Sequence, residues 1–180
     1  MAYDRVIFPL LVCVLCFASY CAPCSMDVGQ TLDLSQFAGK WYFIAGTSTN
    51  LSLSSCGWFL VKETTSTDFV IRFRGHRHKS NIPVVSNIVG KVDGNNIVTY
   101  WRRLRSRRKL GPFYHVIISV KYDTAVGMLV CTETKRYMEN KLAMIWSRER
   151  SLPLPILEEL KSKLGAYVNQ EIRMADHDNC

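Results

Sequence analysis

The chain has 180 residues, of which 48% are hydrophobic and 21% charged, a balance that excludes wholesale disorder and fits one folded domain. Its formal net charge of +8 favours acidic or anionic partners but says nothing about the fold. The sequence contains no Gly-rich phosphate loop and no His-Glu-x-x-His helix, so the common nucleotide-binding and zinc-protease motifs are excluded.

The N-terminal segment has the pattern of a secretory signal peptide. Arg5 gives a basic start, and the apolar run over residues 6–17 is too short to span a membrane and is followed by small residues. We therefore expect a signal peptide over residues 1–21, cleaved after Ala18 or after Cys21, and a single domain over residues 22–180. A membrane anchor is the alternative, and the polar sequence directly after the run disfavours it.

Four cysteines remain in the mature chain if cleavage follows Cys21. In a secreted protein four cysteines favour two disulfides, and three connectivities are open. Asn50 begins an Asn-Leu-Ser sequon, and glycosylation of Asn50 would agree with secretion. The remaining cysteines are Cys24, Cys56, Cys131 and Cys180.

Short apolar runs separated by turn-like breaks fill residues 39–148. In one of them Phe69, Ile71 and Phe73 alternate with other residues, which predicts a strand with one apolar face. The Asp-Gly-Asn-Asn sequence at residues 93–96 is a hairpin signal between two further runs. Eight strands are expected, over residues 39–47, 56–63, 68–74, 83–92, 97–102, 112–120, 125–132 and 141–148.

The pattern changes to helical spacing after the eighth run. Four apolar residues recur at helical intervals behind Pro153 and Pro155, and Gly165 marks the expected end of this helix. A last apolar run over residues 167–174 is consistent with one more strand. Eight strands at hairpin spacing predict an all-β fold, either an up-and-down barrel or a sandwich. The apolar helix positions are Ile156, Leu157, Leu160 and Leu164.

Motifs at both ends of the strand region resemble those of the lipocalin family. Gly-Lys-Trp at residues 39–41 resembles the Gly-x-Trp signature at the start of the lipocalin barrel, and residues 34–37 resemble the short helical turn before it. Ile-Trp-Ser-Arg at residues 145–148 resembles the last-strand motif. The resemblance implies an eight-stranded antiparallel up-and-down barrel with one C-terminal helix packed outside. It also implies a cation–π contact between Arg148 and Trp41 at the barrel floor.

Within the family the chain most resembles the apolipoprotein D and insect bilin-binding branch, over residues 24–180. In that branch a cysteine before the barrel pairs with one on the seventh strand, and a second-strand cysteine pairs with one in the C-terminal tail. Carried over, this pattern implies the disulfides Cys24–Cys131 and Cys56–Cys180. The middle motif, Thr-Asp-Tyr in the family, reads Val-Lys-Tyr at residues 120–122 here, so the resemblance is to a divergent member and does not carry over the identity of a ligand.

The resemblance implies a secreted carrier or scavenger, not an enzyme, that holds one small hydrophobic ligand inside the barrel. Retinoids, sterols, fatty acids, pheromones and tetrapyrroles all stay open, and neither a cofactor nor a metal site is expected. Strand alternation suggests which side chains point inward, either to line a cavity or to form a core. The candidates are Phe43, Phe59, Phe69, Ile71, Phe73, Tyr100, Tyr114, Val116, Met128 and Met144.

Two basic segments are unusual for such a barrel. Residues 102–109 hold six cations and residues 72–79 hold four more, and the resemblance would place both in loops at the open end of the barrel. A cationic rim there would attract anionic ligands, acidic glycans or anionic membrane surfaces, whereas solvated loops without a partner are the alternative. Nucleic acid is not expected. The rim residues are Arg102, Arg103, Arg105, Arg107, Arg108 and Lys109.

Two other functions stay open from the sequence. Some lipocalins catalyse an isomerisation with a free thiol inside the barrel, which would require an unpaired cysteine. The second open function is binding of anionic glycans or membranes through the basic segments. His115 could also point into the barrel, where a structural role is favoured over a haem ligand.

Overall fold

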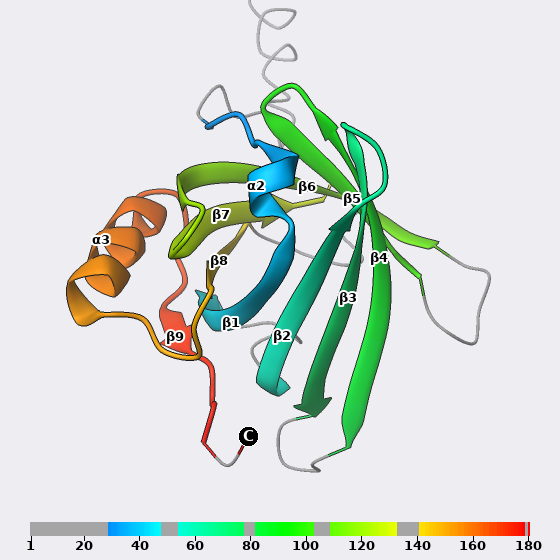
Figure 1. The fold of residues 1–180 in the computed structure, drawn as a ribbon. Coiled ribbons are helices and arrows are strands. Elements are labelled where there is room, and N and C mark those ends of the chain that lie inside the picture. Colours follow the sequence, from blue (N-terminus) through cyan, green and yellow to red (C-terminus); the bar gives the residue numbers. More distant parts are fainter. Residues whose placement is uncertain (1–28, 48–53, 78–81, 103–108, 133–140, 179) are drawn as a thin grey trace, which may run out of the picture.

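A computed structural model describes residues 29–47, 54–77, 82–102, 109–132, 141–178 and 180 (Figure 1). Its main element is a closed antiparallel barrel, in which β1 (Gly39–Thr47) pairs both with β2 (Ser54–Glu63) and with β8 (Leu142–Ser147). This double pairing of β1 closes the sheet and excludes the sandwich. The other barrel strands are β3 (Asp68–Arg77), β4 (Pro83–Asp93), β5 (Asn96–Arg102), β6 (Lys109–Lys121) and β7 (Ala125–Cys131).

Each barrel strand pairs with the strands before and after it in the sequence, so the topology is up-and-down. The turns between β2 and β3, β4 and β5, and β6 and β7 lie at the same end as helix α2 (Leu34–Phe37), which we call the closed end (Figure 1). The opposite, open end is where β1, β3, β5 and β7 finish. The predicted eight-stranded antiparallel barrel is confirmed.

One helix packs against the outside of the barrel, as predicted. Helix α3 (Leu154–Gly165) begins two residues before the expected apolar positions because Pro155 fits the first turn, where no backbone N–H donor is needed. Its buried leucines form a second apolar cluster with Ile44 and Leu129, which point outward from β1 and β7. The chain then returns through β9 (Ile172–Met174), a short strand that pairs with β1. No helix among the described residues is long and apolar enough to cross a membrane.

Helix α2 is held across the closed end by hydrogen bonds at its N-terminus. A carboxylate oxygen of Asp33 accepts the backbone N–H groups of Ser35 and Gln36. Hydrogen bonds from the side chains of Gln36 and Ser35 lower the pKa of Asp33 to about 2. The backbone N–H of Asp33 in turn donates to the hydroxyl of Tyr122, at 2.7 Å. Tyr122 therefore anchors helix α2 to the turn between β6 and β7.

Candidate ligand-binding site

The closed end of the barrel is sealed by Arg148 and Trp41. The guanidinium carbon of Arg148 lies 3.8 Å from the Trp41 ring centroid, so the expected cation–π contact is present. The indole N–H of Trp41 donates to the backbone carbonyl of Phe37, at 2.8 Å, and the Trp41 side chain is completely buried. The floor of the barrel is therefore a packed and hydrogen-bonded layer.

Gly39 is required where the guanidinium group of Arg148 passes the backbone. Its φ of 104° lies in the region that favours glycine, and a Cβ atom there would lie 3.1 Å from Nη1 of Arg148. The geometry explains why glycine stands two residues before Trp41. In this motif the missing side chain of Gly39 leaves room for the Arg148 guanidinium group, and Trp41 supplies the aromatic ring that the guanidinium contacts.

A column of aromatic rings rises through the barrel from this floor. Phe37 lies 6.0 Å from Trp146, and Trp146 is stacked on Phe59 with ring centroids 4.0 Å apart. The ring centroids of Phe59 and Phe73 lie 5.0 Å apart, and those of Phe73 and Trp101 lie 6.3 Å apart. The rings at the closed end are buried, whereas Trp101, one residue from the open end of β5, is half-buried. The aromatic side chains inside the barrel are therefore buried at the closed end, and Trp101 near the open end is more exposed.

The inner wall formed by β5 and β6 carries a polar pair. The hydroxyl of Thr99 lies 2.8 Å from Nε2 of His115, and the Thr99 side chain is buried. Burial lowers the pKa of His115 to about 4, so the imidazole is neutral at physiological pH. A neutral imidazole has one donor and one acceptor nitrogen. The pair therefore places hydrogen-bonding groups in an otherwise apolar interior, beside half-buried Phe113.

Most of the predicted interior residues lie in one buried cluster inside the barrel. Strand alternation predicts that these residues point into the barrel, and in the structure they do. That a ligand contacts them stays a prediction. These residues are Phe43, Phe59, Phe69, Ile71, Phe73, Met128 and Met144.

The predicted face is wrong for Tyr100, Tyr114 and Val116. In β5 the inward positions are those of Ile97 and Trp101, so Tyr100 points outward, where Nζ of Lys109 lies 5.7 Å from its ring centroid. In β6 the inward residues Phe113 and Ile117 place Tyr114 and Val116 on the other face.

The reason for these three errors is that both faces of β5 and of β6 carry apolar residues, so alternation carries no signal there. Val116 is buried on the outer face against Gly29 of the N-terminal segment. The same ambiguity hid the inward residues of the β5–β6 wall. Residues of this wall that the sequence interpretation missed include Thr99, Trp101 and Phe113.

The cysteines of the described residues are all disulfide-bonded. Cys56 pairs with Cys180, with a sulfur–sulfur distance of 2.07 Å and a Cα–Cα distance of 5.5 Å, which confirms this predicted disulfide. Cys131 is also disulfide-bonded. Cys24 lies outside the described residues, so its pairing with Cys131 stays a prediction. None of the three described cysteines supplies a free thiol.

The predicted basic rim is described only at its two ends. Arg102 and Lys109 are paired across the open ends of β5 and β6. The other basic segment was expected in a loop, but Arg72 and Arg74 belong to β3, which continues to Arg77. In the described part of the chain, no group of three or more His, Cys, Asp and Glu residues comes together to hold a metal ion. Asn50, Arg103, Arg105, Arg107 and Arg108 lie outside the described residues.

Comparison with solved structures defines the fold. No protein-family model matches the sequence, and a sequence search of curated proteins finds no match. The allergen Per a 4 from cockroaches is similar, with 14% identity, a TM-score of 0.67, and 88% of this chain and 98% of that chain covered. The amine-binding protein of Rhodnius prolixus has 17% identity, a TM-score of 0.64, and coverage of 85% and 86%. Insecticyanin of the tobacco hornworm Manduca sexta has 14% identity, a TM-score of 0.63, and 86% of both chains covered. The chain therefore has the lipocalin fold.

Proposed function

We propose that the protein is a secreted carrier of the lipocalin family that binds one small hydrophobic ligand in the open-end part of its barrel. The observation that carries this proposal is the graded burial of the aromatic column. The floor rings around Trp41 are completely covered, whereas Trp101 and Phe113 remain half-buried on the inner wall. A ligand that enters from the open end would cover these two rings.

The inward side chains favour a flat, apolar ligand. Aromatic faces and methionine sulfur atoms make their best contacts with planar, polarisable groups. Met128 and Met144 are directly paired across β7 and β8 and face the same interior as Phe73. The Rhodnius prolixus protein with this fold was solved as a tryptamine complex, and tryptamine carries a flat indole ring. This likeness supports an aromatic or conjugated ligand.

The Thr99–His115 pair supplies the polar contact of the proposed site. Apolar ligand sites commonly contain a few placed polar groups that fix the orientation of the ligand. Since the imidazole of His115 is neutral, it can donate to or accept from an uncharged group such as a hydroxyl or a carbonyl. We therefore infer an uncharged ligand with one polar end.

The cysteines support secretion and binding without turnover. A disulfide such as Cys56–Cys180 persists in oxidising compartments. Its pairing is the one implied by the apolipoprotein D and bilin-binding branch, which supports placing the chain near that branch. An isomerase with a free thiol is disfavoured, because each described cysteine is already bonded.

The proposal is tested with N-phenyl-1-naphthylamine, a neutral aromatic fluorescent probe, on two variants of neighbouring residues. Trp101 points inward and Tyr100 points outward on the same strand. We expect saturable binding at one site and a loss of about tenfold in affinity for Trp101→Ala, with Tyr100→Ala close to the wild type. Absence of saturable binding, or an equal loss in both variants, would contradict a site inside the barrel.

A further inference from the structure

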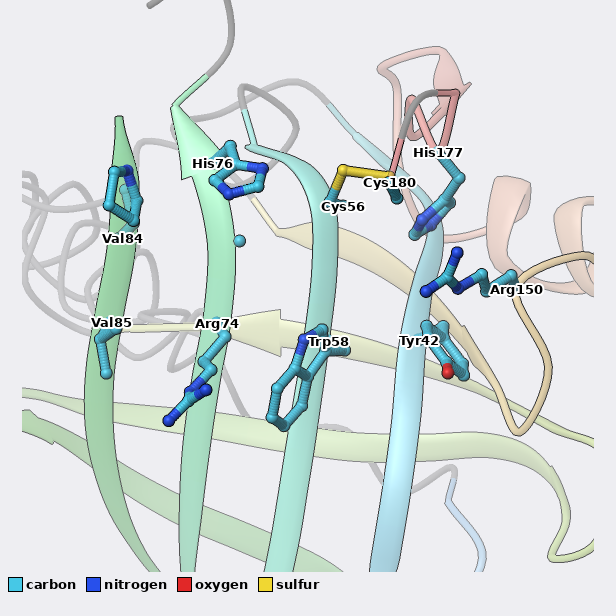
Figure 2. A pocket seen from close by; sticks show the side chains of 12 residues that line it. Tyr42, Cys56, Trp58, Arg74, His76, Val84, Val85, Arg150, His177 and Cys180 are labelled. Atoms are coloured by element: carbon cyan, nitrogen blue, oxygen red, sulfur yellow. A yellow bond between two sulfur atoms is a disulfide. The ribbon is translucent and has the colours of Figure 1, made fainter. Parts of the chain in front are cut away.

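A pocket of about 310 Å³ lies on the outer face of β1 to β4, beside the C-terminal tail (Figure 2). Three of the strand side chains that form it alternate with inward residues, whereas Val84 at its edge also packs against the barrel core. Phe43, Phe59 and Phe73 point inward, and their neighbours along the strands point into the pocket. The chemically distinctive lining residues are Tyr42, Trp58, Arg74, His76, Arg150 and His177.

The base of the pocket is a row of side chains that are directly opposite one another on four adjacent strands. Tyr42 is paired with Trp58, Trp58 with Arg74, and Arg74 with Val85. Directly opposite residues on one face of a sheet are close enough for their side chains to touch. The row therefore presents two aromatic rings, a guanidinium group and an apolar residue as one continuous surface.

The cations at the pocket form no ion pair with the described residues. No side-chain carboxylate is found among its described lining residues. The ion pairs between described residues use Lys121, Lys161, Lys163 and Arg173, and so leave Arg74, Arg150 and nearby Lys40 without an acidic partner. Interaction with Lys40 lowers the pKa of the Tyr42 hydroxyl, and Arg150 acts in the same direction.

The aromatic rings hold these cations in place without cancelling their charge. The Lys40 ammonium lies 4.6 Å from the centroid of Tyr42 and 4.9 Å from that of Trp58. The Arg74 guanidinium lies 5.6 Å from the Trp58 centroid, and the Arg150 guanidinium lies 5.9 Å from the Tyr42 centroid. Cation–π contacts of this kind restrict the side chains and leave their N–H groups available as donors.

The wall formed by the C-terminal tail is fixed to the barrel by three contacts. Nε2 of His177 donates to the backbone carbonyl of Phe43 at 2.6 Å. The backbone N–H of Cys56 donates to the carbonyl of Asp176 at 2.9 Å, and the Cys56–Cys180 disulfide closes the same region. The pocket is thus built before any ligand arrives, which reduces the entropy lost on binding.

We propose that this outer pocket binds a small aromatic oxyanion, in which a flat ring carries a phosphate or sulfate group. Guanidinium groups are well suited to such anions because their N–H donors match the oxygen atoms. The oxyanion would lie against Arg74, with Arg150 on the other side of the pocket, and the ring would lie against Trp58 and Val85. The volume is at the lower end of the range for small-molecule sites, which favours a compact ligand.

Isothermal titration with phenyl phosphate tests this proposal, with inorganic phosphate and phenol as the two separate halves of the ligand. We expect phenyl phosphate to bind at least about tenfold more tightly than either half, and Arg74→Gln to weaken its binding about tenfold. Arg72→Gln is the matched control, because Arg72 is on the same strand and face but is paired with Leu60 and Asn87, away from the pocket. This control should bind as the wild type does.

Three results would overturn the proposal: no saturable binding of phenyl phosphate to the wild type, equal binding of phenol or of inorganic phosphate, or an equal loss in Arg72→Gln. Saturating N-phenyl-1-naphthylamine should leave the affinity for phenyl phosphate unchanged, and competition between the two would place the anion elsewhere. Because the two probes address different sites, failure of this site leaves the proposed barrel carrier untouched, and the reverse also holds.

Discussion

The guanidinium group of Arg148 lies over the ring of Trp41 and, in the same position, donates to three backbone carbonyl groups. Nε donates to Tyr122 at 2.8 Å, Nη1 to Lys40 at 3.1 Å and Nη2 to Gln36 at 2.7 Å. These carbonyls belong to the β6–β7 turn, to β1 and to α2. One side chain therefore joins three segments that are distant in the sequence.

Replacing Arg148 should lower stability by about 2–4 kcal/mol, because it removes charge-assisted hydrogen bonds to three carbonyls and the contact with Trp41. Arg148→Met keeps much of the apolar stem, so the loss measured is that of the guanidinium group with its three hydrogen bonds and its contact with the Trp41 ring. Urea denaturation measures the change. Arg150→Gln is the control, since Arg150 is exposed, and it should change stability by less than about 0.5 kcal/mol. Similar denaturation midpoints for Arg148→Met and the wild type would refute the structural role.

The strands of the barrel could be predicted closely because their signals are local. The strand from Gly39 to Thr47 has the predicted limits, and so has the helical turn from Leu34 to Phe37, which the resemblance implied. Alternation and turn residues are properties of a few neighbouring positions, and the sequence displays them directly. The contact between Arg148 and Trp41 is long-range, and only the resemblance to a family indicated it.

The candidate site could be predicted where one face of a strand is clearly polar. In β3, exposed Arg72 and Arg74 alternate with buried Phe73, so the inward face is evident. In β6, Val116 is buried outside the barrel and Ile117 inside, and sequence alone cannot separate the two kinds of burial. The pocket on the outer face of β1 to β4 could not be predicted either. It depends on the strand register and on where the C-terminal tail is attached to the barrel.

The disulfide between Cys56 and Cys180 should contribute substantially to stability. It joins residues separated by 124 positions, and in the chain-entropy model such a crosslink stabilises the fold by at most about 5 kcal/mol. Cys180→Ser should lower the unfolding midpoint and leave one titratable thiol, that of Cys56. The double variant Cys56→Ser/Cys180→Ser controls for effects of the new thiol and should show a similar loss of stability. A titration of Cys180→Ser that finds no thiol would mean that Cys56 has another partner.

The buried imidazole of His115 should make stability fall in mild acid. Its folded-state pKa, about 4, lies below the ordinary value of 6.5, because burial disfavours the charged form. Between these two values the unfolded chain binds a proton that the folded chain does not. The stability linked to His115 is therefore fully present above pH 6.5 and declines as the pH falls toward 4, by up to about 3 kcal/mol.

Urea denaturation at pH 7 and at pH 4.5 measures this decline. His115→Gln keeps hydrogen-bonding capacity beside Thr99 but does not titrate, so its stability should change less between the two pH values than that of the wild type. The comparison of the two chains cancels the contribution of other titrating groups. An identical change in both would show that His115 is not the group responsible.

Gly90 makes room for the ring of Phe69 inside the barrel. A Cβ atom on Gly90 would lie 2.2 Å from Cζ of Phe69, far closer than carbon atoms can approach, and Phe69 is buried among the core residues. Gly90→Ala should therefore force the ring to move and destabilise the protein by about 1–3 kcal/mol. Gly165→Ala is the matched control, because no atom beyond its chain neighbours and the backbone of its own helix lies within 4 Å of the added methyl group. Thermal unfolding should show a lower midpoint for Gly90→Ala and an unchanged or slightly higher one for Gly165→Ala. Equal midpoints for Gly90→Ala and the wild type would mean that Phe69 has another position available to it in the barrel.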